Sequence, residues 1–177
     1  YNDAATTTSG EEAAGQTVIT LAAGGGVLLK VRDIVTFGAV TQQYRITAIN
    51  TDNITVEALN QPVGTGLIAT VASGTAVNRY WEFYASFDKA PGKSASALAA
   101  GGSNDEMHVV VADEDGTISG TPHSILETYA FVSMASDAKD SANNSNYYKK
   151  VIGNKSEWVY WSGHNTSIIT PANQDRT

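Results

Sequence analysis

The sequence contains no cysteine in its 177 residues. This absence excludes disulfide bonds, thiolate metal sites and cysteine nucleophiles within the chain. Basic residues are also few: 11 Lys and Arg stand against 18 Asp and Glu, for a net charge of -7. Because no basic stripe is available to displace counterions from phosphates, we expect no nucleic-acid partner. No apolar run approaches the roughly 18 residues of a membrane-spanning helix, so we expect no membrane-spanning segment.

Sequence motifs of catalysis are missing as well. The chain has neither the GxSxG pattern of a nucleophile elbow nor the GxxxxGK pattern of a phosphate-binding loop. Its three histidines, His108, His123 and His164, show no metal-ligand spacing, and His108, within a strand, is expected to be a satisfied core or interface histidine. We therefore expect a protein that is not an enzyme, with no catalytic, cofactor-binding or metal-binding residue and no cofactor. A hydrolase with a pocket joining His108 or His123 to nearby carboxylates is the weakest alternative.

The first part of the chain has the pattern of a β-rich unit. The clearest element is a hairpin, with strands at Tyr44–Ile49 and Ile54–Leu59 around a turn at Asn50–Asn53. Tyr44, Ile46 and Ala48 are expected on one face of the first strand. Further strands are predicted at 18–23, 30–37 and 67–71, and residues 1–15 are predicted to be a loop or frayed end. Short strands separated by Gly and Pro indicate a small barrel or sandwich.

The second part begins with an aromatic segment, YWEFYASF at Tyr80–Phe87, which predicts a core strand. A loop at Lys89–Asn104 follows, with a helical turn near Ser94–Ala100. The β-branched run at Met107–Ala112 predicts a strand covered on both faces. The segment DEDG at Asp113–Gly116, three acidic residues followed by glycine, predicts a turn.

Two helices and a strand are predicted beyond this turn. Ser124 and Glu127 have capping-box spacing at the start of a helix expected over Ser124–Ala138. A second helix is predicted at Tyr147–Ile152, with Gly153 as its stop. The aromatic residues Trp158–Trp161 predict a final strand. The expected class is therefore α+β, with a β-rich barrel or sandwich at 1–78 and a mixed α/β layered domain at 79–177.

Two binding interpretations of these motifs remain open. An EF-hand loop placed with Gly116 at its sixth position fails, because Val111 and Pro122 occupy its first and last ligand positions. A solvated turn is favoured there, and a weak cation site at Asp113 and Asp115 is the alternative. The aromatic segments favour a core over an exposed carbohydrate-binding face.

Three segments carry a resemblance to a known family. They are Arg79–Ser94, Asn104–Lys139 and Ser145–Trp161, which include RYWEFYASFDKAPGKS, MHVVVADEDGTISGTPHSILETYAFV and SNYYKKVIGNKSEWVYW. In order and spacing they resemble the tail sheath protein of T-even-like contractile bacteriophages and their marine relatives. The resemblance covers roughly half of the chain and is weaker over residues 1–78.

The resemblance implies a structural subunit that polymerises helically around a tail tube. Such a sheath contracts to drive the tube through the host envelope, and it uses no cofactor. The implied partners are further copies of the subunit and the tube and baseplate proteins. The implied location is the virion tail, after assembly in the host cytoplasm. Because the chain starts at Tyr1 and not at Met, we expect a fragment or processed product. The resemblance implies the middle portion of the subunit, incomplete at its C-terminus, with 1–78 as the end of an inserted, outward-facing domain.

Contacts between subunits are expected in three polar loops of the second part. The expected contact residues are Asp88, Lys89, Lys93, Asp113, Glu114, Asp115, Asp137, Lys139 and Asp140. The main alternative function is a carbohydrate-binding or receptor-binding module of a phage appendage, which requires exposed aromatic side chains.

Overall fold

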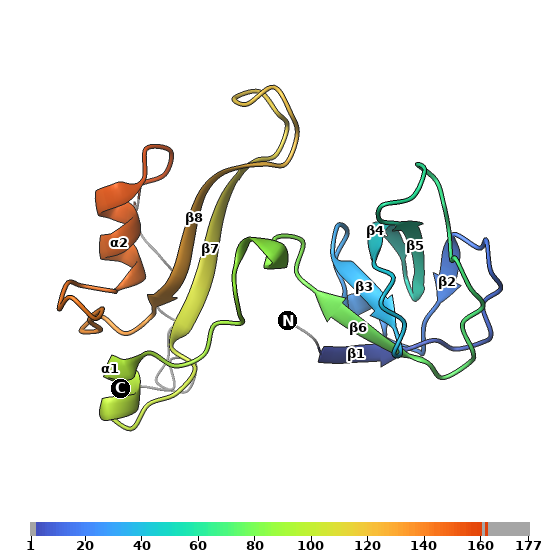
Figure 1. The fold of residues 1–177 in the computed structure, drawn as a ribbon, viewed down its shortest axis with the longest axis horizontal. Coiled ribbons are helices and arrows are strands. Elements are labelled where there is room, and N and C mark those ends of the chain that lie inside the picture. The colour runs from blue at the N-terminus through green and yellow to red at the C-terminus, as the bar shows by residue number, and fades with distance from the viewer. Residues whose placement is uncertain (1–2, 161, 163–177) are drawn as a thin grey trace. The chain divides into compact units, whose positions relative to one another are not determined.

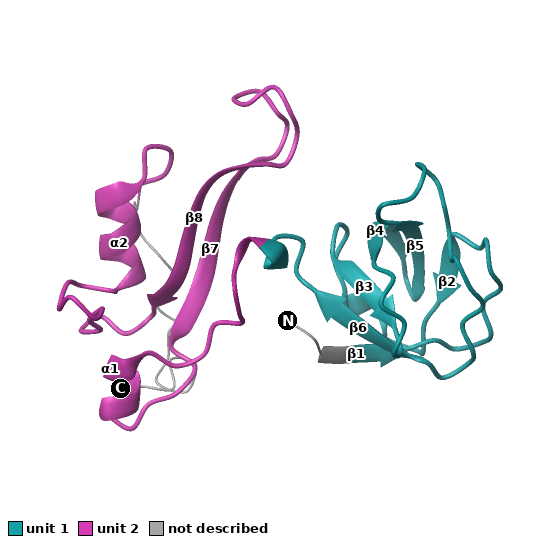
Figure 2. Ribbon diagram, in the orientation of Figure 1, with its two compact units in different colours: residues 1–85 teal, residues 86–177 magenta. Residues whose placement is uncertain are grey.

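The computed structural model describes residues 3–160 and 162, with side chains from residue 5 onward. The chain divides into two compact units, unit 1 at Tyr1–Ala85 and unit 2 at Ser86–Thr177 (Figure 2). The predicted division after residue 78 is wrong, because it would cut the strand Ala76–Tyr80, which belongs to the sheet of unit 1. The predicted α+β class is confirmed, since the described residues form antiparallel sheets with few helices.

Unit 1 is built on one antiparallel sheet of six strands (Figure 1). The strands are β1 (Asp3–Thr7), β2 (Val18–Thr20), β3 (Ile34–Phe37), β4 (Tyr44–Asn50), β5 (Asn53–Ala58) and β6 (Ala76–Tyr80). Their order across the sheet is β1-β6-β3-β4-β5-β2.

The two edges of this sheet meet and close it into a small barrel. Just beyond β1 and β2, Thr8 and Leu21 form an antiparallel bridge. The Ala22 amide donates to the Thr7 carbonyl at 2.8 Å, and the Ser9 amide donates to the Thr20 carbonyl at 2.9 Å. Closure pairs backbone groups that an open sheet would expose at its edges. The short strands predicted a small barrel or sandwich, and this β-rich unit is present.

The predicted hairpin is confirmed as β4 and β5, with one difference in the side-chain pattern. The pairing register shifts between Ile46 and Ala48, which marks a β-bulge. Tyr44 and Ile46 are buried as expected, but Ala48 is exposed, because the extra residue moves it to the outer face.

The core of the barrel is formed by apolar side chains from every strand for which side chains are fully described. Its buried members are Ile19, Leu21, Leu29, Val35, Phe37, Tyr44, Ile46, Ile54, Val56, Ala58, Leu67, Val71 and Val77. A 3-10 helix, η1 (Gly26–Leu28), lies against the β4–β5 turn. The Asp52 carboxylate fixes it there by accepting from the Gly24 and Gly26 amides, each at 3.0 Å.

Two predictions for unit 1 are wrong. Residues 1–15 were expected to be a loop, but β1 lies within them, because its backbone pairs with β6. The segment at 67–71 forms no strand; Val71 makes an isolated bridge with Glu12, and the Leu67 amide donates to the Gln16 carbonyl. In both cases the backbone pairs with residues more than 50 positions away in the sequence, and a local sequence pattern gives no information about such pairing.

The described residues of unit 2 form a long β-hairpin and two short α-helices. Its elements are α1 (Ala95–Ala99), β7 (Glu106–Asp113), β8 (Ser124–Ser133) and α2 (Tyr148–Lys155), and the 3-10 helix η2 (Tyr84–Ser86) lies at the boundary between the units. α1 and β7 confirm the predicted helical turn and strand. The Ser94 side chain caps α1 by accepting from the Ala97 amide.

The predicted helix at Ser124–Ala138 is wrong, because β8 occupies most of this segment. β8 pairs with β7 along its length, from Ser124 opposite Asp113 to Ser133 opposite Glu106. Two register shifts in this pairing interrupt the alternation of side chains, which explains why the sequence lacks a clear strand pattern. The predicted order of strand, helix, helix, strand is therefore replaced by strand, strand, helix.

The core of unit 2 is small. Tyr129 and Val132 of β8 pack with Tyr148 and Ile152 of α2, and half-buried side chains of β7 surround them. Of the eight residues in β7, Asp113 alone is buried. The predicted coverage of this strand on both faces is therefore wrong within the described residues.

Three further predicted elements, two aromatic strands and one helix, differ in extent or conformation from the prediction. The segment Tyr80–Phe87 is not a strand beyond Tyr80, where β6 ends and the chain turns into η2. α2 confirms the second predicted helix, but it continues past Gly153 to Lys155. Residues 158–160 of the final predicted strand have no regular secondary structure, and Trp161 lies outside the described residues.

Candidate interaction surface

The first predicted contact loop remains on the surface of unit 2. Asp88, Lys89 and Lys93 are all exposed. The Lys89 ammonium lies 5.3 Å from the centre of the Phe131 ring, at cation–π distance. This loop is therefore held against the hairpin while its charged groups remain accessible.

His108 attaches the same loop to the hairpin. Its ring stacks on Phe87 with centroids 3.9 Å apart and planes at 5°. Its Nδ1 accepts from the Phe131 amide at 3.1 Å, and its Nε2 lies 2.9 Å from the Lys89 carbonyl. The neutral ring with a proton on Nε2 satisfies both contacts. His108 is thus a satisfied histidine within a strand, as predicted, but it is half-buried and not a member of the described core of unit 2.

The second loop forms the end of the hairpin, and we name Asp113, Glu114 and Asp115 the acidic tip. Asp113 is buried, and its carboxylate accepts from the amides of Gly116 at 3.0 Å and Ile118 at 2.9 Å. The Ser119 amide and hydroxyl donate to it as well. The hydrogen bonds that Ser119 donates are the main cause that lowers the Asp113 pKa. Asp113 therefore organises the tip from within, which makes it a wrong choice as a contact residue.

Glu114 and Asp115, in contrast, are exposed on the acidic tip. Ile118, on the same loop, is 54% exposed. The loop conformation depends on Gly116, whose φ is +79° and whose missing Cβ would lie 2.6 Å from the Pro122 nitrogen. The tip is thus a fixed loop that presents two carboxylates and one apolar side chain.

The third loop, around Asp137, Lys139 and Asp140, is also exposed. Asp140 accepts from the backbone amides of Ala142 at 2.9 Å and Asn144 at 2.8 Å. The hydrogen bond from the Asn144 amide is the main cause that lowers the Asp140 pKa. Asp140 is therefore an ionised group that shapes its own loop.

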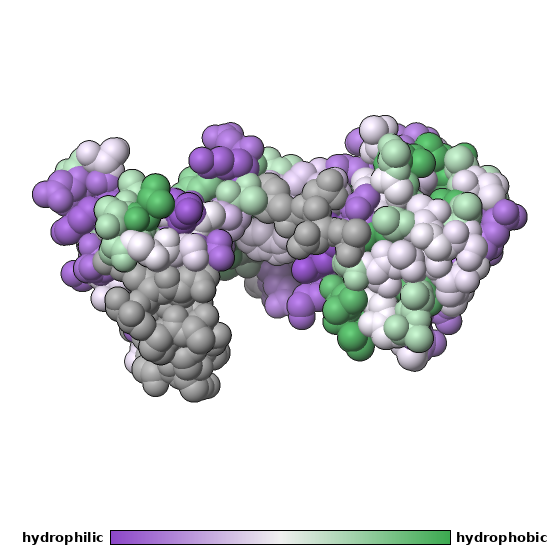
Figure 3. Space-filling model, turned by 90° about the horizontal axis from the view of Figure 1, so that it is seen from below, coloured by the Kyte–Doolittle hydropathy of each residue, from purple (hydrophilic) through white to green (hydrophobic). Residues whose placement is uncertain are grey.

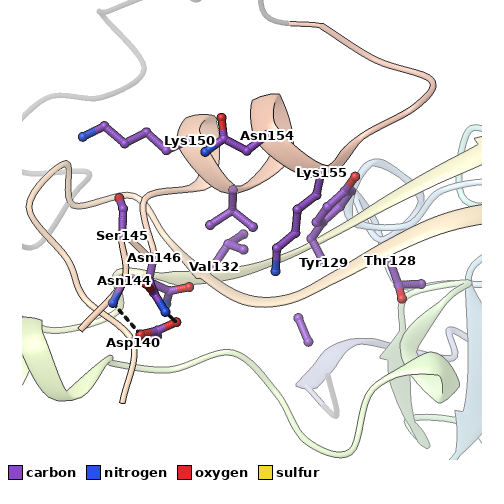
Figure 4. A pocket seen from close by; sticks show the side chains of 12 residues that line it. Thr128, Tyr129, Val132, Asp140, Asn144, Ser145, Asn146, Lys150, Asn154 and Lys155 are labelled. Atoms are coloured by element: carbon purple, nitrogen blue, oxygen red, sulfur yellow. Dashed lines mark hydrogen bonds between the residues drawn. The ribbon is translucent and has the colours of Figure 1, made fainter. Parts of the chain in front are cut away.

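This third loop forms one wall of a groove of about 520 Å³, which we name the lysine groove (Figure 4). The other walls are β8 and α2. The lining residues are Thr128, Tyr129, Ala130, Val132, Asp140, Asn144, Ser145, Asn146, Lys150, Val151, Asn154 and Lys155. In Figure 4, Lys155 extends from α2 toward Val132 and Asn146, whereas Lys150 extends outward along the rim.

The lysine groove is positively charged in an acidic chain. Two lysines line it against the single carboxylate of Asp140. No described carboxylate lies within ion-pair distance of either lysine; the ion pairs Arg32–Glu82 and Arg79–Asp33 both belong to unit 1. Asp140 interacts electrostatically with Lys155, but the second lysine leaves the groove with a net positive charge that suits an anionic partner.

The aromatic segment Tyr80–Phe87 is half-exposed and not part of either core, contrary to the sequence-based preference. Trp81 and Phe83 contact edge to face with centroids 5.3 Å apart, and Tyr80 lies 4.9 Å from Tyr84. Trp158 is also 47% exposed. On the face of unit 1 seen in Figure 3, hydrophobic residues form separate patches within the described surface.

No group of three or more His, Cys, Asp or Glu residues among the described residues could hold a metal ion. At the acidic tip, the Asp113 oxygens point to amide and hydroxyl donors, which is not the arrangement of a cation ligand. Within the described part of the chain, no helix has the length and apolar character needed to cross a bilayer.

Comparison with known proteins identified no relative, since neither a family model nor a curated protein sequence matches this chain significantly.

The sequence predicted the exposed loops but missed the groove. Lys150 and Asn154 of the groove lie four residues apart on one face of α2, and Lys155 follows Asn154. The wall opposite α2 could not be predicted, because β8, which forms it, was predicted to be a helix. The basic pair Lys149-Lys150 was the one available signal.

Proposed function

We propose that this chain is a portion of the structural subunit of a contractile bacteriophage tail sheath. The resemblance of Arg79–Ser94, Asn104–Lys139 and Ser145–Trp161 to that family carries the proposal. The subunit would polymerise helically around a tail tube, meet the tube and baseplate proteins, and act in the virion after assembly in the host cytoplasm. It would act without catalysis.

The small core that the described residues of unit 2 form supports a role in an assembly. A two-stranded hairpin buries little by itself and needs further packing for stability. Val109, Val110 and Val111 of β7 line an apolar groove of about 380 Å³ that also includes Val159 and Tyr160. Such surface is typical of a unit that contacts other parts of a larger structure.

The exposed polar loops support the same proposal. A subunit that changes its neighbours during contraction needs contacts that are modest in area and polar, because such contacts exchange readily. The exposed residues Glu114, Asp115, Asp137 and Lys139 belong to loops of this kind. Helical polymers also require two different surfaces on each subunit, so that contacts repeat without closing.

Electron microscopy of the complete gene product, expressed alone and concentrated, tests this proposal. Hollow tubes or stacked rings of uniform width are the expected result. A product that stays monomeric at all concentrations and ionic strengths contradicts it.

Binding of a carbohydrate receptor is the second candidate function. The half-exposed rings of Tyr80, Trp81 and Phe83 favour it, because sugars stack on accessible aromatic faces. A glycan array probed with the purified protein distinguishes the two candidates. Saturable binding that Trp81→Ala abolishes, in a protein that forms no polymer, favours the receptor-binding function.

A further inference from the structure

We propose that the acidic tip of one copy docks in the lysine groove of a neighbouring copy, forming a head-to-tail contact of the polymer. This inference rests on the proposed function, because it names the surfaces by which the subunits would associate. It concerns unit 2 alone, which carries both surfaces.

The charges and apolar groups of the two surfaces match. The tip presents the carboxylates of Glu114 and Asp115, with Ile118 beside them. The groove presents the ammonium groups of Lys150 and Lys155. Its lining also includes the half-buried Val151, which offers an apolar contact for the isoleucine. The Asp140 carboxylate also lines the groove and interacts electrostatically with Lys155, but two lysines against one carboxylate leave the groove with a net positive charge.

The tip cannot occupy the groove of its own copy. Ser124 lies opposite Asp113 at the tip end of the hairpin, and Val132 of the groove lies eight residues further along β8. At about 3.3 Å per residue, these positions are roughly 26 Å apart. An acidic tip that docks in this groove must therefore come from another copy of the chain.

The tip is prepared for docking before it binds. The Asp113 carboxylate fixes the loop through the amides of Gly116, Ile118 and Ser119. A loop that is already ordered loses little conformational entropy on association.

Tip and groove are different surfaces, so each copy offers one of each. Such a heterologous contact leaves an unused tip and an unused groove on every pair of copies, so further copies can add. If the rotation between neighbouring copies does not close a ring, the result is an open helical polymer. This is the symmetry that a helical sheath requires. A contact between charged groups also weakens as the salt concentration rises.

Charge reversal with rescue tests the contact in the complete gene product. One variant reverses the tip (Glu114→Lys with Asp115→Lys), another reverses the groove (Lys150→Glu with Lys155→Glu), and a third combines all four changes. A control reverses two exposed charges of unit 1, Glu11→Lys with Lys30→Glu. The readouts are the fraction of protein that sediments as polymer, electron microscopy, and circular dichroism for folding.

We expect the tip and groove variants to lose polymer at least roughly tenfold, because like charges then face each other. The combined variant restores the opposite pairing and should polymerise, as should the control. If the wild type polymerises and both single-surface variants match it, the inference is wrong while the proposed function stands. Failure of the combined variant to assemble, with normal circular dichroism, also overturns the inference. A wild type that never polymerises contradicts the proposed function itself.

Discussion

Asp105 and Ser94 form a two-point hydrogen-bonded pair inside unit 2. The Ser94 amide donates to Oδ1 of Asp105 and the Ser94 hydroxyl donates to Oδ2, each at 2.7 Å. The Ser133 hydroxyl donates to the same Oδ2. Asp105 is fully buried. One carboxylate therefore joins the cap of α1, the start of β7 and the end of β8.

Replacing this carboxylate should destabilise unit 2. In Asp105→Asn, the amide nitrogen faces hydroxyl donors that it cannot accept from, so buried groups lose their partners. We expect a loss of about 1.5–3 kcal/mol in the free energy of unfolding, measured by urea denaturation. Asp115→Asn, at an exposed position, should change it by less than about 0.5 kcal/mol. Equal effects of the two substitutions would contradict the structural role of Asp105.

The same residue predicts a dependence of stability on pH. Burial alone would raise the Asp105 pKa, but hydrogen bonds from Ser133 and Ser94 outweigh it and lower the pKa below 3.8. A folded-state pKa below the unfolded value stabilises the fold above the unfolded pKa. This contribution is lost as the pH falls below 3.8 and through the folded pKa. The free energy of unfolding, measured by urea denaturation at several pH values below 4, should fall less steeply with decreasing pH in Asp105→Asn than in the wild type. An equally steep fall in both proteins would refute the assignment.

Gly26 supplies a test of the barrel in unit 1. A Cβ at this position would lie 1.8 Å from the Thr51 carbonyl oxygen, which the β4–β5 turn holds in place. Gly26→Ala should therefore cost about 2–3 kcal/mol through backbone displacement. Gly10→Ala is the matched control, because no atom lies within 4 Å of its added Cβ. Chemical denaturation followed by tyrosine and tryptophan fluorescence measures both, and a neutral Gly26→Ala would show that the turn is placed differently.

His108 supplies a test of the loop that begins unit 2. His108→Leu keeps an apolar side chain but removes the contacts with the Lys89 carbonyl and the Phe131 amide. We expect a loss of about 1–2 kcal/mol and faster proteolysis after Lys89 and Lys93. His123→Asn should have little effect, because His123 has a φ of +62° and asparagine tolerates that conformation. Equal proteolysis rates for His108→Leu and the wild type would contradict the attachment of the loop by this ring.

Local sequence patterns predicted those elements whose partners are close in the chain. The β4–β5 hairpin is one, since its strands are joined by a short turn and Ile54, Val56 and Ala58 alternate without interruption. The helical turn of α1 is another, because Ser94 caps it directly.

The prediction of a helix in place of β8 shows where such patterns fail. Ser124 and Glu127 have capping-box spacing, but in the structure the Glu127 carboxylate accepts from Tyr129, Ser156 and Glu157. Pairing with β7 decides the conformation, and tertiary pairing of this kind overrides weak local preferences. The lysine groove could not be predicted for the same reason, because β8 forms one of its walls.

The location of this protein on a virion tests the central claim most directly. Antibodies raised against the chain, visualised with gold particles on intact phage by electron microscopy, report where its copies lie. A tail sheath subunit predicts gold particles along the whole length of the contractile tail. Labelling confined to fibres or to one end of the tail, or its absence from every tail, would contradict the account.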